Sequence, residues 1–281
     1  MISIKNIIKT VYHNFKSYSL LSVDVAWGGV ISSMFLSHFT LTQSSVVANT
    51  ILGLVIWSIY TFDHLLDVKK SKANQLSERL LFHRKHSRLL TKVLILTIIV
   101  IGILLPFIPS TTLLYGSILS CIVLIYFLSI HFLNSKFIVH KELIIAIIYT
   151  AGIGLGPISQ MNEPFSKIQL LIIGIFFIIV LFNLLVFSLM DKKEDLSAKF
   201  PSFVMAAGEP ITLIVLKSLG LLGVLLIICL MALGSLKETL LLTLMFGVLQ
   251  LIFWKRDNVH IVKYYRYAGD GIFLFPIFYL F

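Results

Sequence analysis

Two pairs of aspartates with identical spacing are the residues of this chain best suited to chemistry. Asp63 and Asp67 form the first pair, and Asp191 and Asp195 form the second. Residues four apart in a helix lie on one face with Cβ atoms about 5–6 Å apart, and hard divalent cations prefer oxygen ligands. The spacing therefore predicts two Mg²⁺-binding pairs, with a Mg²⁺-bridged diphosphate as the matching substrate group.

Both pairs occur where a long apolar segment runs into a Lys-rich loop. One such pair is a common pattern, and a solvated helix end at a membrane surface also accounts for it. The second pair repeats the spacing and the surroundings of the first, which favours metal binding over that simpler interpretation. The repetition also indicates two weakly similar halves within one domain that covers residues 1–281.

The composition is far more apolar than that of a soluble protein. Of the 281 residues, 58% are hydrophobic and 13% are charged, and the mean hydropathy is +0.98, whereas an average soluble domain is about 25% charged. Apolar segments, most of them long enough to cross a bilayer, recur at 18–39, 43–62, 90–108, 111–130, 142–160, 168–190, 210–232, 236–254 and 268–281. We therefore expect an all-α, polytopic membrane bundle of nine transmembrane helices.

Positive charges alternate between the segments that connect these predicted spans. Cytoplasmic segments of membrane proteins are enriched in Lys and Arg, and with a cytoplasmic N-terminus 20 of the 23 Lys and Arg residues fall on that side. The side comprises residues 1–17, 63–89 with Lys92, 131–141, 191–209 and 255–267. The net charge of +10 is then an orientation signal, and it requires no nucleic acid as a partner.

This topology places both aspartate pairs, and the opening of the site, on the cytoplasmic side. We expect a multi-pass protein of a prokaryotic cytoplasmic membrane. Residues 1–17 alternate apolar and basic side chains, a pattern typical of an amphipathic segment that lies in the membrane interface.

The two motifs, the nine predicted spans and their orientation resemble the UbiA superfamily of intramembrane prenyltransferases over nearly the whole chain. The resemblance implies nine helices around a central cavity that opens to the lipid. It also implies that Asp63, Asp67, Asp191 and Asp195 are catalytic, because this family binds a prenyl diphosphate through Mg²⁺ held by two such motifs.

The chain departs from the family pattern in each motif. The family usually has Asn four residues before the first aspartate, and here that residue is Ile59, which provides no polar ligand. In the second motif Lys199 stands where Gly is common, and Ser202 stands where Thr is common. We therefore expect a divergent member, with Ser202 retained as a substrate-binding residue.

Several Lys and Arg side chains lie within or after the aspartate motifs, and four of them are candidate substrate contacts. Arginine forks match phosphate oxygens in a bidentate manner, so we expect contacts to the diphosphate from Arg79 and Arg84, with further positive charge from Lys192 and Lys199. The alternative is that these residues only anchor the loops on the cytoplasmic side.

Three of the polar residues within the predicted spans are of particular interest. An ionised Asp at the centre of a membrane helix costs about 2.5–3.5 kcal/mol, so such a residue usually faces a cavity or a partner. Asp24 is expected to orient or deprotonate an acceptor in the substrate pocket, or else to form a hydrogen bond with a neighbouring helix. Asp270 is expected to form an ion pair with Arg266, four residues earlier. Tyr149 is expected to line the pocket, where its π face stabilises an allylic cation.

Three functions fit these features. The first is a Mg²⁺-dependent prenyltransferase that joins an isoprenoid chain to an aromatic, quinone-precursor or lipid acceptor. The second is a terpene cyclase of the same superfamily, which needs no acceptor, and the third is a transporter that uses the acids as an ion path and releases no diphosphate. For the first, the expected partners are a prenyl diphosphate, a small lipophilic acceptor and membrane lipid.

Overall fold

The computed structural model describes residues 18–43, 45–70, 77–132, 140–198 and 200–280. Every regular element in these ranges is helical, which confirms the predicted all-α class. The predicted interfacial segment 1–17 lies outside the described residues.

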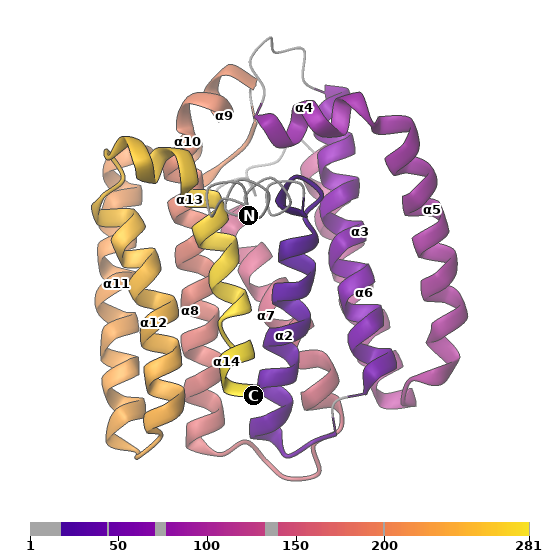
Figure 1. The fold of residues 1–281 in the computed structure, drawn as a ribbon, viewed down its shortest axis with the longest axis vertical. Coiled ribbons are helices and arrows are strands. Elements are labelled where there is room, and N and C mark those ends of the chain that lie inside the picture. The colour runs from indigo at the N-terminus through magenta and orange to yellow at the C-terminus, as the bar shows by residue number, and fades with distance from the viewer. Residues whose placement is uncertain (1–17, 44, 71–76, 133–139, 199, 281) are drawn as a thin grey trace, which may run out of the picture.

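Eight long helices form an upright bundle (Figure 1). They are α2 (Val23–Thr40), α3 (Val46–Lys70), α5 (Ser87–Leu104), α6 (Ser110–Phe132), α7 (Lys141–Ser159), α8 (Lys167–Met190), α11 (Glu209–Ala232) and α12 (Leu236–Trp254). Shorter elements connect or follow them: α4 (Glu78–Lys85), η1 (Leu105–Phe107), α9 (Lys192–Ala198), α10 (Phe203–Ala207), α13 (Val259–Gly271), η3 (Ile272–Leu274) and α14 (Ile277–Leu280).

Seven described helices are long and apolar enough to cross a membrane, as expected for a multi-pass membrane protein. They are α3, α5 extended through η1, α6, α7, α8, α11 and α12. The first predicted span corresponds to α2, which is not among these seven, and the last is divided between α13, η3 and α14. Glycine and proline are poor helix formers, and α13 ends at Gly271 while Pro276 stands directly before α14. The prediction of nine spans is thus confirmed for seven.

The helix α8 forms the centre of the bundle and packs against α7, α11, α12 and α13. A capping box of Ser166 and Gln169 begins this helix. Beyond that first turn its polar side chains are Asn183 and Ser188, and a helix that is apolar on all sides belongs either to a protein core or to a membrane span. The side chain of Phe176 is accordingly fully buried.

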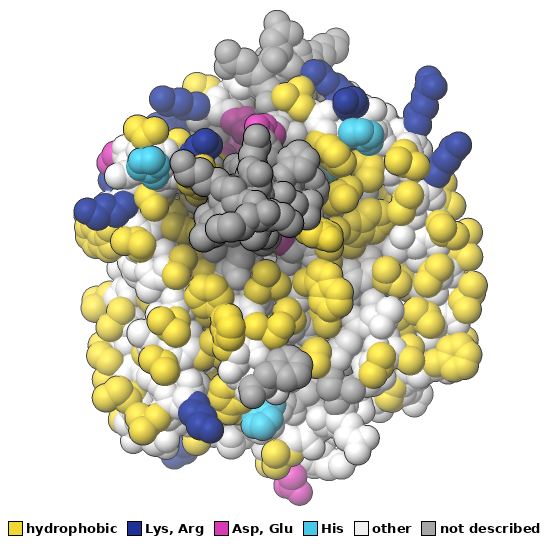
Figure 2. All heavy atoms as spheres, in the orientation of Figure 1, with side chains coloured by type: hydrophobic (Ala, Val, Ile, Leu, Met, Phe, Trp, Pro, Cys, Tyr) yellow, Lys and Arg dark blue, Asp and Glu magenta, His cyan; other side chains and the backbone are white. Residues whose placement is uncertain are grey.

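Helices α5 and α6 lie at the periphery and present apolar side chains outward. Only 6% of the apolar stretch of α6 is buried, compared with 61% for α8. Figure 2 shows apolar side chains over the middle of one face of the molecule, with Lys and Arg mainly near the end that carries α4, α9 and α13. A surface with this distribution is suited to a lipid environment.

Among the described residues, the connecting segments predicted to share one side of the membrane gather at one end of the bundle. The short helices α4, α9 and α10 and the start of α13 all lie there (Figure 1). The helix α3 continues to Lys70 and keeps Asp63 and Asp67 within one helix, as their spacing predicted. The second pair occupies the C-cap of α8 and the following helix α9.

Gly269 allows α13 to approach α8 closely. A Cβ atom added at Gly269 would lie 2.6 Å from Oδ1 of Asn183 and 2.6 Å from the ring of Phe187. We expect Gly269→Ala to lower the free energy of unfolding by about 1–3 kcal/mol, the usual cost of overpacking. Thermal unfolding in detergent measures this, with Gly271→Ala as the control because nothing lies within 4 Å of its added Cβ atom. Equal unfolding midpoints for the two variants would contradict the close approach.

Candidate active site

One large cavity runs along the inside of the bundle, with a volume of about 2050 Å³. Side chains from α2 to η3 line it, including all four predicted metal-binding aspartates. Away from these acids the wall is mainly apolar, with Ile101, Leu119, Ile148 and Leu155 among its residues. The cavity therefore has a charged end and an apolar body.

Five charged residues from α3, α7, α8 and α9 make up the charged end, which we call the outer polar layer. They are Asp63, Asp67, Lys141, Asp191 and Asp195. Electrostatic interactions connect them across the cavity, since Lys141 interacts with Asp63, Asp67 and Asp195, and Asp195 interacts with Asp191. The structure thus brings together two aspartate pairs that are far apart in the sequence.

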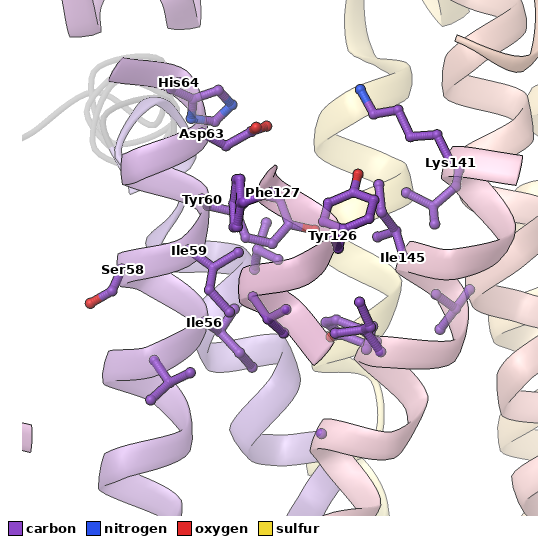
Figure 3. Close-up of a pocket in the computed structure, with 18 of the residues that line it drawn as sticks. Ile56, Ser58, Ile59, Tyr60, Asp63, His64, Tyr126, Phe127, Lys141 and Ile145 are labelled. Atoms are coloured by element: carbon purple, nitrogen blue, oxygen red, sulfur yellow. The ribbon is translucent and has the colours of Figure 1, made fainter. Parts of the chain in front are cut away.

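Figure 3 shows how part of this layer is positioned. Asp63 extends from α3 toward the side on which α7 extends the amine of Lys141, with Tyr126 between them, while Ser58 points away. Ile59, at the position where Asn was expected, lines the cavity below Asp63. An apolar side chain therefore occupies that part of the wall.

Asp191 is held by two residues of α13. Nη2 of Arg266 lies 2.5 Å from Oδ2 of Asp191, and the hydroxyl of Tyr265 donates a hydrogen bond to Oδ1. The predicted ion pair between Arg266 and Asp270 is wrong, because Asp270 instead pairs with Arg79 of α4 at 3.3 Å. The i, i+4 spacing was a weak guide here because each side chain reaches a partner on a different helix.

Burial raises the pKa of Asp195 to about 6, and the neighbouring carboxylate of Asp191 adds to the rise. Both effects disfavour the charged carboxylate, because desolvation and like charge raise the free energy of an anion. A cation bound nearby would act in the opposite direction. A bound cation would therefore favour the ionised form of Asp195.

The donor atoms of the outer polar layer suit Mg²⁺. Within the described residues, no three His, Cys, Asp or Glu side chains are close enough to hold a metal by themselves. Mg²⁺ is usually bound by one or two carboxylates together with water and substrate phosphates, so the carboxylates fit an ion shared with a diphosphate. Asp63, Asp67 and Asp195 would hold such ions, and Asp191 would do so if Arg266 exchanged its carboxylate for a phosphate.

The predicted cationic residues fall into different places. Arg79 is buried and lines the cavity, where Nη2 also donates to Oγ of Ser19 at 3.1 Å. Arg84 is exposed and lies away from the cavity wall. Lys192 pairs with Glu209 at 2.7 Å and is not part of the wall either. Lys199 lies outside the described residues.

The other predicted site residues are all buried or half-buried. Ser202 and Tyr149 line the cavity, as expected for substrate contacts. Asp24 is 4% exposed at the start of α2, and the cavity wall includes its neighbour Val25 instead. Oδ1 of Asp24 accepts a hydrogen bond from the backbone N–H of Val25. The roles of these residues stay predictions.

One basic residue of the site, Lys141, was missed by the sequence reasoning. Lys141 begins α7, and Nζ donates to the carbonyl of Pro201 at 3.4 Å. Its neighbour Glu142 is buried and accepts the backbone N–H of Phe203, which fixes the loop after α9 against α7. The adjacent Lys and Glu at the start of an apolar span were a usable signal. Arg266 was noticed but was assigned to the wrong partner.

Comparison with known proteins gives one match. The sequence model of the UbiA prenyltransferase family matches residues 25–273. No curated protein and no solved structure matches the chain. The matched range extends from α2 to η3 and includes both aspartate pairs and every residue that lines the cavity. The chain therefore belongs to the UbiA prenyltransferase family.

Proposed function

We propose that this protein is a Mg²⁺-dependent intramembrane prenyltransferase that transfers an isoprenoid chain from a prenyl diphosphate to an aromatic, quinone-precursor or lipid acceptor. The observation that carries the proposal is the cavity, which has carboxylates and Lys141 at one end and an apolar body of isoleucine and leucine side chains. A prenyl diphosphate has the same division into a charged head and an apolar tail. Family membership supports the same activity.

The residues of the outer polar layer, together with Arg266 of α13, have separate tasks in this reaction. Lys141 and Arg266 donate to diphosphate oxygens, and the carboxylates hold the metal. Bound Mg²⁺ supplies Lewis-acid stabilisation of the leaving diphosphate. The apolar wall excludes water, which would otherwise capture the carbocation. Tyr149 lines the cavity, and its π face would stabilise an allylic cation there.

Product analysis tests the proposal. Purified protein in lipid nanodiscs is incubated with geranyl, farnesyl or geranylgeranyl diphosphate, with and without phenolic or quinol acceptors, in Mg²⁺ or in EDTA. We expect diphosphate release and a prenylated acceptor only in Mg²⁺. A hydrocarbon or alcohol ring product from the prenyl diphosphate alone would identify a cyclase, and the absence of diphosphate release would refute an enzymatic role.

We also propose that the end of the bundle with α4, α9 and α13 faces the cytoplasm, in keeping with the Lys and Arg distribution. Single cysteines at Ser197 in α9 and at Glu163 between α7 and α8 report on opposite ends. In a background that lacks Cys121 and Cys229, an impermeant thiol reagent added to intact cells should label the cysteine at position 163 only. Labelling at position 197 from outside would reverse the orientation.

A further inference from the structure

Tyr126 is a polar residue of the cavity that takes no part in the reaction described above. It belongs to α6, a peripheral helix of which only 6% of the apolar stretch is buried. One face of this helix nevertheless lines the cavity, with Leu119, Val123, Tyr126 and Phe127 among its residues. A polar side chain on that face lies where it can contact a bound substrate.

The side chain of Tyr126 lies at the level of the outer polar layer. Figure 3 shows its ring between the side chains of Asp63 and Lys141, with the hydroxyl toward the charged end of the cavity. The phenol interacts electrostatically with Asp63 and Asp67 of α3 and with Glu142 of α7, in agreement with a position between these two helices. Tyr126 thus reaches the layer from α6, a helix that contributes none of its five charged residues.

A ring contact between α3 and α6 holds Tyr126 at this depth. Phe62 directly precedes Asp63, and Phe127 directly follows Tyr126. The ring centroids of Phe62 and Phe127 lie 5.5 Å apart in a T-shaped arrangement, one of the favoured geometries of aromatic pairs. Because each phenylalanine is the sequence neighbour of a residue on the cavity wall, the pair places the phenol of Tyr126 opposite the first aspartate pair.

The hydroxyl of Tyr126 is available to a ligand. Tyr126 is half-buried and lines the cavity. Its hydroxyl makes no hydrogen bond to another described residue, and it is not one of the unpaired atoms that the protein encloses completely. A phenol has one O–H donor, so this donor can be given to a group that enters the cavity.

We propose that Tyr126 is a further catalytic residue of the prenyl transfer, whose hydroxyl donates a hydrogen bond to the diphosphate from α6 and takes the place of a polar side chain at position 59 of α3. The inference rests on the proposed function. Ile59 lies one turn before Asp63 on the same face of α3, and it lines the cavity with an apolar side chain. The wall of α3 therefore offers no side-chain donor at this position, and Tyr126 offers one from α6.

A hydrogen bond from Tyr126 assists the departure of the diphosphate. The bond between C1 of the prenyl chain and the diphosphate oxygen breaks, and its electron pair stays on the diphosphate. A donor aimed at a group whose negative charge grows binds the transition state more strongly than the ground state. Tyr126 keeps its proton throughout, so the contact adds no charge to the layer that contains Lys141.

Tyr126→Phe tests the contact in the full chain in nanodiscs with Mg²⁺. We expect kcat/KM for diphosphate release to fall about tenfold, the effect of one lost hydrogen bond to a charged group. The factor should be the same for geranyl, farnesyl and geranylgeranyl diphosphate, because the hydroxyl contacts the head group and phenylalanine keeps the ring. Tyr115→Phe is the matched control, since Tyr115 is on the same helix, is 54% exposed and does not line the cavity. An unchanged kcat/KM, or a loss that increases with tail length, would overturn the assignment.

Ile59→Asn tests the exchange between the two helices. In the Tyr126→Phe protein an amide at position 59 returns a polar contact from α3, so the double variant should regain most of the lost kcat/KM. Ile59→Asn alone should stay near the wild-type value, because two groups that supply one contact have non-additive effects. Ile59→Leu in the Tyr126→Phe background adds no polar group and should restore nothing.

The rescue also separates a substrate contact from a structural role. If Tyr126 served only the packing of α6, an amide on α3 would restore no activity, and Tyr126→Phe would lower the kcat/KM by the same factor with Ile or Asn at position 59. That equal loss would overturn the proposal.

Binding of farnesyl thiolodiphosphate, an analogue that resists cleavage, distinguishes this proposal from the proposed function. The wild-type protein should bind it in Mg²⁺, and Tyr126→Phe should bind it more weakly. If Tyr126→Phe equals the wild type in both binding and turnover, the role of Tyr126 is overturned and the proposed function stands. If the wild type does not bind the analogue, the proposed function is refuted together with the role of Tyr126.

Discussion

Asp63→Asn and Asp67→Asn should each reduce the rate of diphosphate release at least about a hundredfold, equivalent to about 2.7 kcal/mol of transition-state stabilisation. Both side chains line the charged end of the cavity from one face of α3. Asparagine keeps the size of the side chain and removes the negative charge that holds a divalent cation. We therefore expect the variants also to need a higher Mg²⁺ concentration for half-maximal activity. Diphosphate release measured over a range of Mg²⁺ concentrations shows this change.

Asp257→Asn is the control for this experiment. Asp257 is exposed in the loop before α13 and does not line the cavity. Its substitution removes the same charge and should leave the rate unchanged. Circular dichroism and size-exclusion profiles like those of the wild type would show that the variants are folded. Near-normal release by both Asp63→Asn and Asp67→Asn would contradict a metal cluster on α3.

Lys141→Met should raise KM for the prenyl diphosphate by about tenfold to a hundredfold. A hydrogen bond to a charged group contributes about 1.5–3 kcal/mol, and Lys141 is the cation that interacts with Asp63, Asp67 and Asp195. Without the Lys141 ammonium, the neighbouring carboxylates would repel the diphosphate more strongly. Initial rates over a range of prenyl diphosphate concentrations measure the change, and Lys141→Arg should restore part of the affinity.

The same substitution should have the opposite effect on the affinity for Mg²⁺. Lys141 repels a cation bound by the neighbouring carboxylates, so Lys141→Met should bind Mg²⁺ more tightly in the absence of diphosphate. Arg84→Met is the control, because Arg84 is exposed and lies away from the cavity wall. If Arg84→Met weakens diphosphate binding as much as Lys141→Met does, the substrate contacts the loop cations outside the cavity.

Local patterns were sufficient for much of the architecture. The length of each apolar segment depends only on neighbouring residues, and seven of the predicted spans are helices that suit a membrane. The spacing of Asp63 and Asp67 placed both on one face of a helix, and the structure keeps them on the cavity wall. The segment at 268–281 was predicted less well, because its apolar composition did not reveal the break between η3 and α14.

The sequence by itself therefore determined the helical class, most of the spans and the two acidic pairs, because hydropathy and helical periodicity act over short stretches of chain. Only the tertiary structure decided which side chains meet. Arg266 reaches Asp191 across 75 positions, and Arg79 reaches Asp270 across 191. The faces on which helices approach one another follow from the packing of the whole bundle, with α8 at its centre. Spacing along one helix carries no information about those contacts.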